Sequence, residues 1–212
     1  MSERPTREQQ RDRLLEAALV HVPFDGWSRR SLVAGARDIG LEPAQARRLF
    51  PRGGDDLLAH LDRWADREML ARIDASTLDG MRVRDRIAAL VRARLEALAP
   101  HREAVRRGVA ARLLPTNALA AGGSLWRTLD IIWTAAGDRA RDASYFTKRT
   151  LLGAVWTSTF FYWLDDRSPG QGDSWAFLER RIDNVMQVGR ARARLDDTLE
   201  RFARFNPLAA RR

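Results

Sequence analysis

The stretch SYFTKRTLLGAVWTSTFFYWLDDRSPGQGDSWAFLERR, residues 144 to 181, decides the fold of this chain. From Leu151 to Leu164 it contains no charged residue. An apolar stripe recurs there at steps of about four residues, formed by Leu152, Trp156, Phe160 and Trp163. This period predicts a helix, and the uncharged run is shorter than the roughly 20 residues that cross a bilayer. We expect a central core helix, or one that lines an apolar cavity or a subunit interface.

The segment after this helix predicts a sharp turn and another helix. The turn runs from Asp165 to Gly170 and contains Ser168 and Pro169. Asp173 is placed to cap the next helix, because its side chain can accept a hydrogen bond from a free backbone N–H. One face of that helix carries Trp175, Leu178, Ile182, Val185 and Met186.

The remaining sequence predicts further helices, and no alternation typical of strands persists anywhere. Thr6 and Gln9 have the spacing of a capping box. Gly40 ends a second helix, and Pro43 suits the first turn of a third. Further helices are expected from Asp55 onward and over residues 82–99, 101–113, 117–136, 144–165 and 173–189. The sequence therefore predicts an all-α domain of nine to ten helices.

Composition sets broad limits on function. The 212 residues suit one domain, or one domain and a tail. Cysteine is absent, which excludes disulfides and thiolate chemistry. The formal net charge of +9 is compatible with nucleic acid or an anionic membrane surface as a partner. Lys148 is the only lysine, so we give weight only to where the charges lie. The N-terminus lacks the apolar segment of a secretory signal.

The turn and the helix after it carry a resemblance to a known family. The turn contains the motif D-R-S-P at residues 166–169, and D-S-W-A-F-L-E-R-R follows at residues 173–181. These motifs resemble the ubiquinone (coenzyme Q) biosynthesis accessory proteins that are the ninth of the coenzyme Q set. The resemblance is specific over residues 120–190, and it is looser but collinear over residues 8–80.

The resemblance implies a fold, a ligand and partners. It implies a TetR-regulator-like helical domain with a degenerate helix-turn-helix and a C-terminal amphipathic helix. It implies a non-enzymatic protein, without cofactors, that binds an isoprenoid lipid or quinone precursor and presents it to the demethoxyubiquinone hydroxylase. A homodimer through residues 144–165 and 173–189 is also implied, and we expect a cytoplasmic location, peripheral at the inner face of the membrane. The expected parts are residues 1–80, 81–190 and 191–212.

Tryptophans and other apolar residues of the C-terminal helices form the candidate lipid-binding site. Such pockets are mostly apolar with a few polar groups. Small residues at 157–159 lie where a tight core would prefer larger side chains, so they leave room for a chain-shaped ligand or for close helix packing. Ordinary core packing is the alternative. The candidate set is Trp126, Leu129, Trp133, Leu152, Val155, Trp156, Thr159, Phe160 and Trp163.

Two further surfaces are predicted to contact partners. Aromatic and cationic residues side by side have the composition of an interface hot spot, and the resemblance places the hydroxylase there. That patch is Tyr145, Phe146, Thr147, Lys148 and Arg149. The tail reads as an amphipathic helix with a basic face, suited to an anionic membrane surface, or else it packs on the body or a dimer mate. Its candidate membrane-binding residues are Leu195, Leu199, Arg201, Phe202, Arg204, Phe205 and Leu208.

The alternative function is a TetR-type transcriptional repressor with an apolar effector pocket. Three short N-terminal helices and a basic chain favour DNA binding. However, Glu42 lies at the start of the expected recognition helix, where a carboxylate would repel phosphates. Arg47 stands where TetR regulators carry a tyrosine, and Gly53 or Gly54 stands where they carry a lysine. We therefore expect no nucleic-acid partner.

Catalytic and metal-binding patterns are missing from the sequence. His21, His60 and His101 lie far apart, and none forms a histidine or glutamate pair at the i, i+3 or i+4 spacing of a helical metal site. Asp56 and His60 share a helix face, which we interpret as a solvated contact. No phosphate-binding or nucleophile motif occurs. The sequence therefore predicts neither an enzyme nor a metal site.

Overall fold

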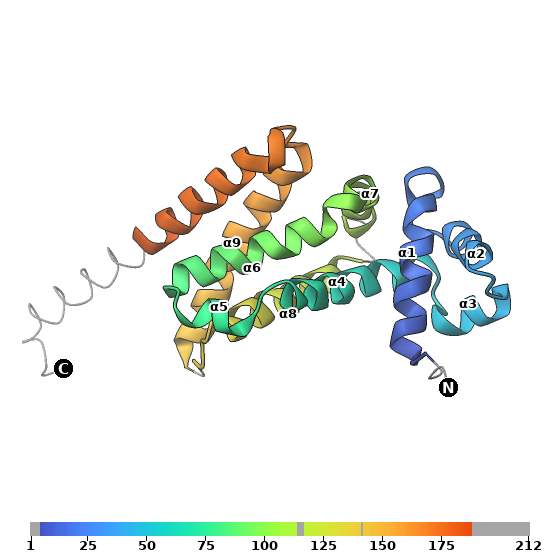
Figure 1. Ribbon diagram of the computed structural model, residues 1–212, viewed down its shortest axis with the longest axis horizontal. Helices are drawn as coiled ribbons and strands as arrows, with labels where there is room; N and C mark the ends of the chain where they lie inside the picture. Colours follow the sequence, from blue (N-terminus) through green and yellow to red (C-terminus); the bar gives the residue numbers. More distant parts are fainter. Residues whose placement is uncertain (1–4, 114–116, 141, 188–212) are drawn as a thin grey trace, which may run out of the picture. The chain divides into compact units, whose positions relative to one another are not determined.

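The computed structural model describes residues 5–113, 117–140 and 142–187, and all regular secondary structure within them is helical (Figure 1). The α-helices are α1 (Arg7–Asp25), α2 (Arg29–Asp38), α3 (Pro43–Leu49), α4 (Gly54–Ala71), α5 (Ala75–Asp79), α6 (Val83–Leu98), α7 (Arg102–Arg112), α8 (Ala118–Ala135) and α9 (Ala143–Asp165). Short 3-10 turns occupy η1 (Ala99–His101) and η2 (Pro169–Gln171), and a further helix covers residues 172–187. The predicted all-α class is confirmed.

The chain forms two compact units, residues 1–153 and residues 154–212, and the boundary falls within α9. Residues 1–80 and 81–153 therefore share one unit, and the division into residues 1–80, 81–190 and 191–212 stays a prediction. The predicted amphipathic tail, residues 191–212, lies outside the described residues. Among the described helices, none is long and apolar enough to cross a membrane.

The N-terminal helices begin at the capping residues that the local sequence provides. The Thr6 side chain accepts a hydrogen bond from the Gln9 backbone N–H at 3.2 Å, and the Gln9 side chain accepts one from the Thr6 N–H at 2.8 Å. This is the predicted capping box of α1. Ser28 and Ser31 cap α2 in the same reciprocal way, and Pro43 lies in the first turn of α3 as expected.

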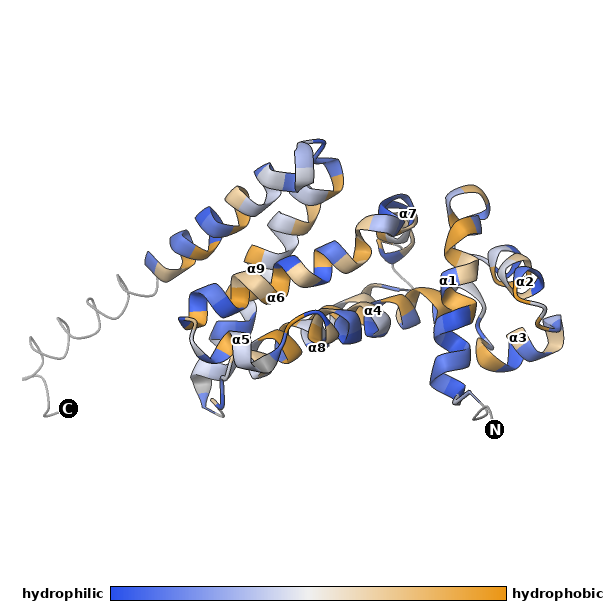
Figure 2. Cartoon of the chain, in the orientation of Figure 1, coloured by the Kyte–Doolittle hydropathy of each residue, from blue (hydrophilic) through white to orange (hydrophobic). Residues whose placement is uncertain are grey.

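Helix α4 is the element around which the first unit packs. It contacts α1, α2, α6 and α8. Figure 2 shows that α1 is hydrophilic over its first turns and hydrophobic farther along, where it lies against α2. The buried side chains of α4 include Leu57, Leu58, Leu61, Trp64 and Met69. Their burial against four neighbouring helices places α4 at the centre of the apolar core of this unit.

A buried ion pair crosses this core. The Asp66 and Arg94 side chains are 4% and 5% exposed, and Arg94 Nε donates to Asp66 Oδ1 at 2.8 Å. Thr128 Oγ1 donates to the same carboxylate oxygen at 2.9 Å. Arg94 also donates to the backbone carbonyl of Asp62. The Asp66 carboxylate thereby joins α4, α6 and α8, because each of the three helices contributes one of these groups.

We predict that Arg94→Leu lowers the free energy of unfolding by about 3 kcal/mol, because it leaves the buried Asp66 carboxylate with only one cation, the more distant Arg127, whose Nε lies 3.5 Å away. The matched control is Arg92→Leu on the same helix, where Arg92 is half-exposed and pairs with Glu96 at 2.7 Å. Exposed pairs of this kind contribute at most about 1 kcal/mol. Urea unfolding of both variants measures the difference, and equal losses would contradict a structural role for the buried pair.

Candidate functional site

In the second unit, α9 presents a row of aromatic rings. Trp156 and Phe160 stack with their centroids 6.1 Å apart, and Phe160 lies 6.1 Å from Trp163. Trp156 and Trp163 are buried, as is Val155. Trp163 Nε1 donates to Gln171 Oε1 at 2.8 Å, so the turn after the helix fixes this indole. Five predicted lipid-binding residues, Val155, Trp156, Thr159, Phe160 and Trp163, therefore come from this one stretch of α9.

Thr159 is the polar exception within this row. Its side chain is fully buried, and its Oγ1 has no hydrogen-bond partner in the structure. The neighbouring Ser158 hydroxyl, in contrast, donates to the carbonyl of Ala154 at 2.8 Å. A buried hydroxyl without a partner destabilises a fold by about 1–3 kcal/mol. Thr159 is therefore suited to a hydrogen bond with a group that the chain itself does not supply.

In the first unit, the other candidate lipid-binding residues lie on α8 and the first half of α9. Leu129 and Leu152 are buried. A Cβ on Gly153 would lie 3.3 Å from Leu129 Cδ1, so glycine permits close packing of α9 on α8 there. Trp133 Nε1 donates to the Lys148 carbonyl at 3.1 Å. Trp126 is only partly buried, and its ring lies against the predicted partner patch.

Three residues of that patch, Tyr145, Lys148 and Arg149, form hydrogen bonds and ion pairs within the chain. Arg149 is 2% exposed, and it pairs with Asp130 at 2.6 Å and Asp138 at 3.3 Å. Its guanidinium carbon lies 3.4 Å from the centroid of the Tyr145 ring. Tyr145 Oη donates to Asp130, and Lys148 Nζ pairs with Asp138 at 2.6 Å. Burial opposes ionisation of Asp138, but hydrogen bonds and charge from Lys148, with Arg149, hold its pKa below the ordinary value.

The outward part of the patch is smaller than the sequence suggested. Phe146 is 63% exposed, and Thr147 is also exposed. The Phe146 ring lies 6.0 Å from the Trp126 ring and 5.1 Å from the Tyr145 ring. Tyr145, Lys148 and Arg149 hold α9 on α8, while Phe146 and Thr147 are presented to solvent. A partner-binding role for all five residues stays a prediction.

The turn with the D-R-S-P motif is held by Asp166. Its carboxylate accepts hydrogen bonds from the backbone N–H of Ser168 at 2.7 Å and of Ser174 at 2.9 Å. Burial raises the pKa of Asp166, but the hydrogen bonds from Ser174 and Ser168 outweigh it and lower the pKa to about 2. The prediction that Asp173 caps this helix is wrong. The η2 turn starts the helix at residue 172 and folds Asp166 back against its first N–H groups.

The N-terminal helices show why the usual lysine of a DNA-binding module is missing. A Cβ on Gly54 would lie 2.0 Å from the backbone carbonyl oxygen of Trp27, so no larger residue fits there. Glu42 is exposed at the start of α3 and caps nothing with its side chain. Arg47 and Arg48 are exposed on the same helix. The surface of α3 therefore presents both signs of charge.

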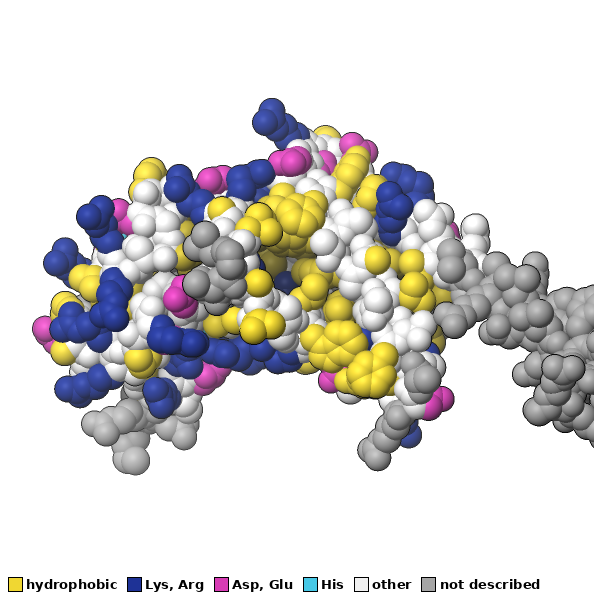
Figure 3. All heavy atoms as spheres, turned by 180° about the vertical axis from the view of Figure 1, so that it is seen from behind, with side chains coloured by type: hydrophobic (Ala, Val, Ile, Leu, Met, Phe, Trp, Pro, Cys, Tyr) yellow, Lys and Arg dark blue, Asp and Glu magenta, His cyan; other side chains and the backbone are white. Residues whose placement is uncertain are grey.

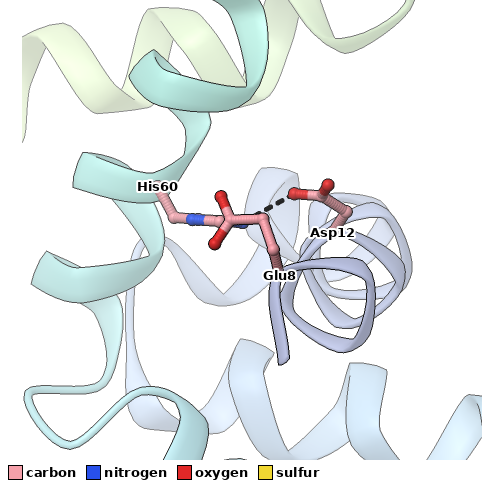
Figure 4. A group of neighbouring side chains, drawn as sticks. All are labelled: Glu8, Asp12 and His60. Carbon is pink, nitrogen blue, oxygen red and sulfur yellow. Dashed lines mark hydrogen bonds and ion pairs between the residues drawn. The ribbon is translucent and has the colours of Figure 1, made fainter. Parts of the chain in front are cut away.

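One side-chain cluster was not predicted from the sequence. Glu8, Asp12 and His60 bring ligand-type atoms within 4.8 Å of one another (Figure 4). His60 Nε2 donates to Asp12 Oδ1 at 2.8 Å, whereas Asp56 pairs with an arginine in the loop before α4. Arg67 donates to Glu8 at 2.7 Å and to Asp12 at 2.5 Å. Burial lowers the pKa of His60, although its bond to Asp12 opposes this. Because a guanidinium already neutralises both carboxylates, the cluster is suited to joining α1 to α4.

A small pocket also lies in the first unit, between α4, α7 and α8. Its volume is about 150 Å³. Its wall includes Asp62, which accepts hydrogen bonds from Arg112 and Ser124 at 2.6 Å each. Ligand pockets usually measure about 300–1,000 Å³, so this space is too small for a polyprenyl chain.

The fold resembles that of TetR-type regulators. The crystal structure of the TetR transcriptional regulator from Nitrosomonas europaea superposes with a TM-score of 0.70 at 21% sequence identity, over 84% of this chain and 98% of that chain. At this identity the likeness shows the fold alone. It confirms the predicted TetR-like architecture, in which the helix-turn-helix-like part precedes a larger helical body.

Sequence comparison gives the family. The COQ9 family model matches residues 118–189. The ubiquinone biosynthesis protein COQ9, mitochondrial, of Drosophila melanogaster is 32% identical over 182 residues, which are 84% of this chain and 56% of that protein. The COQ9-B protein of Xenopus laevis is 31% identical over 202 residues, which are 92% of this chain and 69% of that protein. The chain belongs to the COQ9 family, as its motifs indicated, and it spans between about half and two thirds of the length of these relatives.

We predict that substitutions at two residues of the patch change the stability by different amounts. Phe146→Asp changes an exposed side chain in the first turn of α9, where an acidic residue suits the helix dipole, so the melting temperature stays within about 2 °C. Arg149→Leu removes the buried guanidinium shared by Asp130 and Asp138, which keep only Tyr145 and Lys148, and lowers the free energy of unfolding by about 2 kcal/mol. Circular dichroism during thermal and urea unfolding measures both. A large loss with Phe146→Asp would show that this ring belongs to the core.

Proposed function

We propose that this protein is a non-enzymatic, lipid-binding accessory protein of ubiquinone biosynthesis. In this proposal it binds an isoprenoid quinone precursor and presents it to the demethoxyubiquinone hydroxylase. The observation that carries the proposal is membership of the COQ9 family, whose relatives are named for ubiquinone biosynthesis. The chemistry would belong to the hydroxylase, so this chain needs to supply only a binding surface.

The side chains of α9 support an apolar ligand with a polar head. The row of Trp156, Phe160 and Trp163 offers ring faces that suit an isoprenoid chain. The Thr159 hydroxyl, buried without a partner, suits one oxygen of a quinone head group. The α8 residues Trp126, Leu129 and Trp133, in the first unit, stay candidate lipid-binding residues as predicted from the sequence.

Membrane access and dimerisation complete the proposal. The basic, amphipathic tail would hold the protein at an anionic membrane surface, close to a lipid-soluble substrate. Exposed apolar residues on α9 and on the helix over residues 172–187 would meet a second copy. These include Phe161, Tyr162 and Met186, which are 40–48% exposed.

The ligand proposal is tested with Thr159→Val. We expect the purified variant to be at least as stable as the wild type, because the change removes a buried hydroxyl that has no hydrogen-bond partner among the described residues. We expect it to retain about fivefold less of a quinone-headed isoprenoid, since loss of one hydrogen bond is worth about 1 kcal/mol. Solvent extraction followed by mass spectrometry measures the bound lipid.

Two control variants make this test specific. Thr159→Ser keeps the hydroxyl and should retain the lipid, and Ser158→Ala removes a hydroxyl that is already paired within the helix. Equal lipid content in Thr159→Val and the wild type would remove Thr159 from the site. Absence of any isoprenoid from the wild type, with a salt-dependent DNA shift, would favour the repressor reading instead.

The partner proposal is tested with Phe146→Asp. Truncating an exposed aromatic anchor should weaken binding of the hydroxylase about tenfold or more. Leu70→Asp is the matched control, because Leu70 is 45% exposed on α4, a helix that carries no residue of the patch. Surface plasmon resonance with immobilised hydroxylase gives both affinities. If the two variants bind as the wild type does, the Phe146 surface is not the docking site.

A further inference from the structure

A second uncharged run of sequence lies on the surface of the first unit. No residue from Leu113 to Trp126 is charged, in a chain of which 31% is Asp, Glu, Lys or Arg. Leu113, at the end of α7, is 76% exposed, and Leu119, in the first turn of α8, is 92% exposed. Large exposed apolar side chains that lie close together in a sequence are typical of an interaction surface.

The start of α8 is open over its first two turns. Ala118, Leu119 and Ala120 are exposed, and so are Gly122 and Gly123. A Cβ built on either glycine would meet nothing within 4 Å, so the described residues leave this stretch uncovered. Two glycines within a helix weaken it by about 1 kcal/mol each. Neither has a positive φ, so the fold of the described residues gives no reason for them.

Basic residues border this apolar surface on both sides. Helix α7 carries four arginines and one glutamate. Arg106 and Arg107 are exposed one to two turns before Leu113, and their side chains are 44% and 47% exposed. Arg127 follows the run directly, with 39% exposure. Figure 3 shows hydrophobic side chains exposed among basic and acidic ones on one face of the molecule.

We propose that this surface, formed by Leu113, Leu119 and the start of α8 with Arg106 and Arg107 beside it, is a membrane-docking tip that inserts into an anionic bilayer. The leucines would enter the region between head groups and acyl chains, and the arginines would pair with lipid phosphates. The run between arginines favours a bilayer over a protein partner, because it offers no charged side chain for specific recognition. The inference rests on the proposed membrane function, and it adds a contact in the body that is independent of the tail.

The absence of cysteine permits a direct test. Single variants Leu119→Cys and Leu70→Cys of the full chain each carry one environment-sensitive dye. We expect vesicles of phosphatidylcholine and phosphatidylglycerol to shift the emission of the dye at residue 119 to shorter wavelength, and lipid-borne quenchers to reach it. The dye at residue 70 should not change. Leu113→Asp with Leu119→Asp should lower the vesicle-bound fraction about tenfold, since both the apolar area and the charge balance change.

A third labelled variant, Leu199→Cys, separates this inference from the tail proposal. A response at residue 199 with none at residue 119 would overturn the tip and leave the membrane function standing. A response at residue 119 only on addition of hydroxylase, without vesicles, would also overturn it, because the surface would then bind protein. If the wild type binds no vesicles, the tip and the tail proposal both fail. The lipid content measured by extraction then stands as the separate test of ligand binding.

Discussion

The buried pair of Asp66 and Arg94 is the interaction on which the first unit depends. A charge placed in a core is tolerated only when a partner and further hydrogen bonds satisfy it. Here Thr128 shares the same carboxylate oxygen, so α4, α6 and α8 must keep one register for all three groups to meet. Apolar side chains set the volume of this core, but they would accept small shifts of one helix along another. The ion pair does not, and together with the Thr128 hydrogen bond it fixes the register of α8 against α4 and α6.

A second network of polar side chains holds α9 against α8. Arg149 lies between Asp130 and Asp138, and the Tyr145 ring covers its guanidinium. The sequence predicts an exposed hot spot at residues 145–149. In the structure, Tyr145, Lys148 and Arg149 instead join α9 to α8. What this stretch presents to solvent is Phe146, supported by the Trp126 ring. A partner that binds Phe146 would meet a rigid support, because the side chains behind it are held by charge-assisted hydrogen bonds.

Two uncharged runs of equal length differ in how exposed their apolar side chains are. The run from Leu151 to Leu164 supplies buried rings and one buried hydroxyl without a partner, which suits a ligand taken up inside. The run from Leu113 to Trp126 leaves two leucines almost fully in water, which suits a surface that docks outside. Neither run contains a charged residue, so the difference lies in what packs against each. A lipid carrier needs both kinds of surface, one to hold the chain and one to approach the membrane from which the chain comes.

The sequence by itself determined most of the helices, the cap of α1 and the family. The capping box at Thr6 and Gln9, the proline of α3 and the four-residue apolar stripe of α9 are local signals, because hydrogen bonds within a few residues carry them. Tertiary structure alone decided which polar residues meet. His60 pairs with Asp12, 48 positions away, and not with Asp56 on its own helix. Asp166 replaces Asp173 at the start of the last described helix. Such pairings depend on the angles at which helices cross and turns fold back, and neither the period nor the composition of a sequence contains those angles.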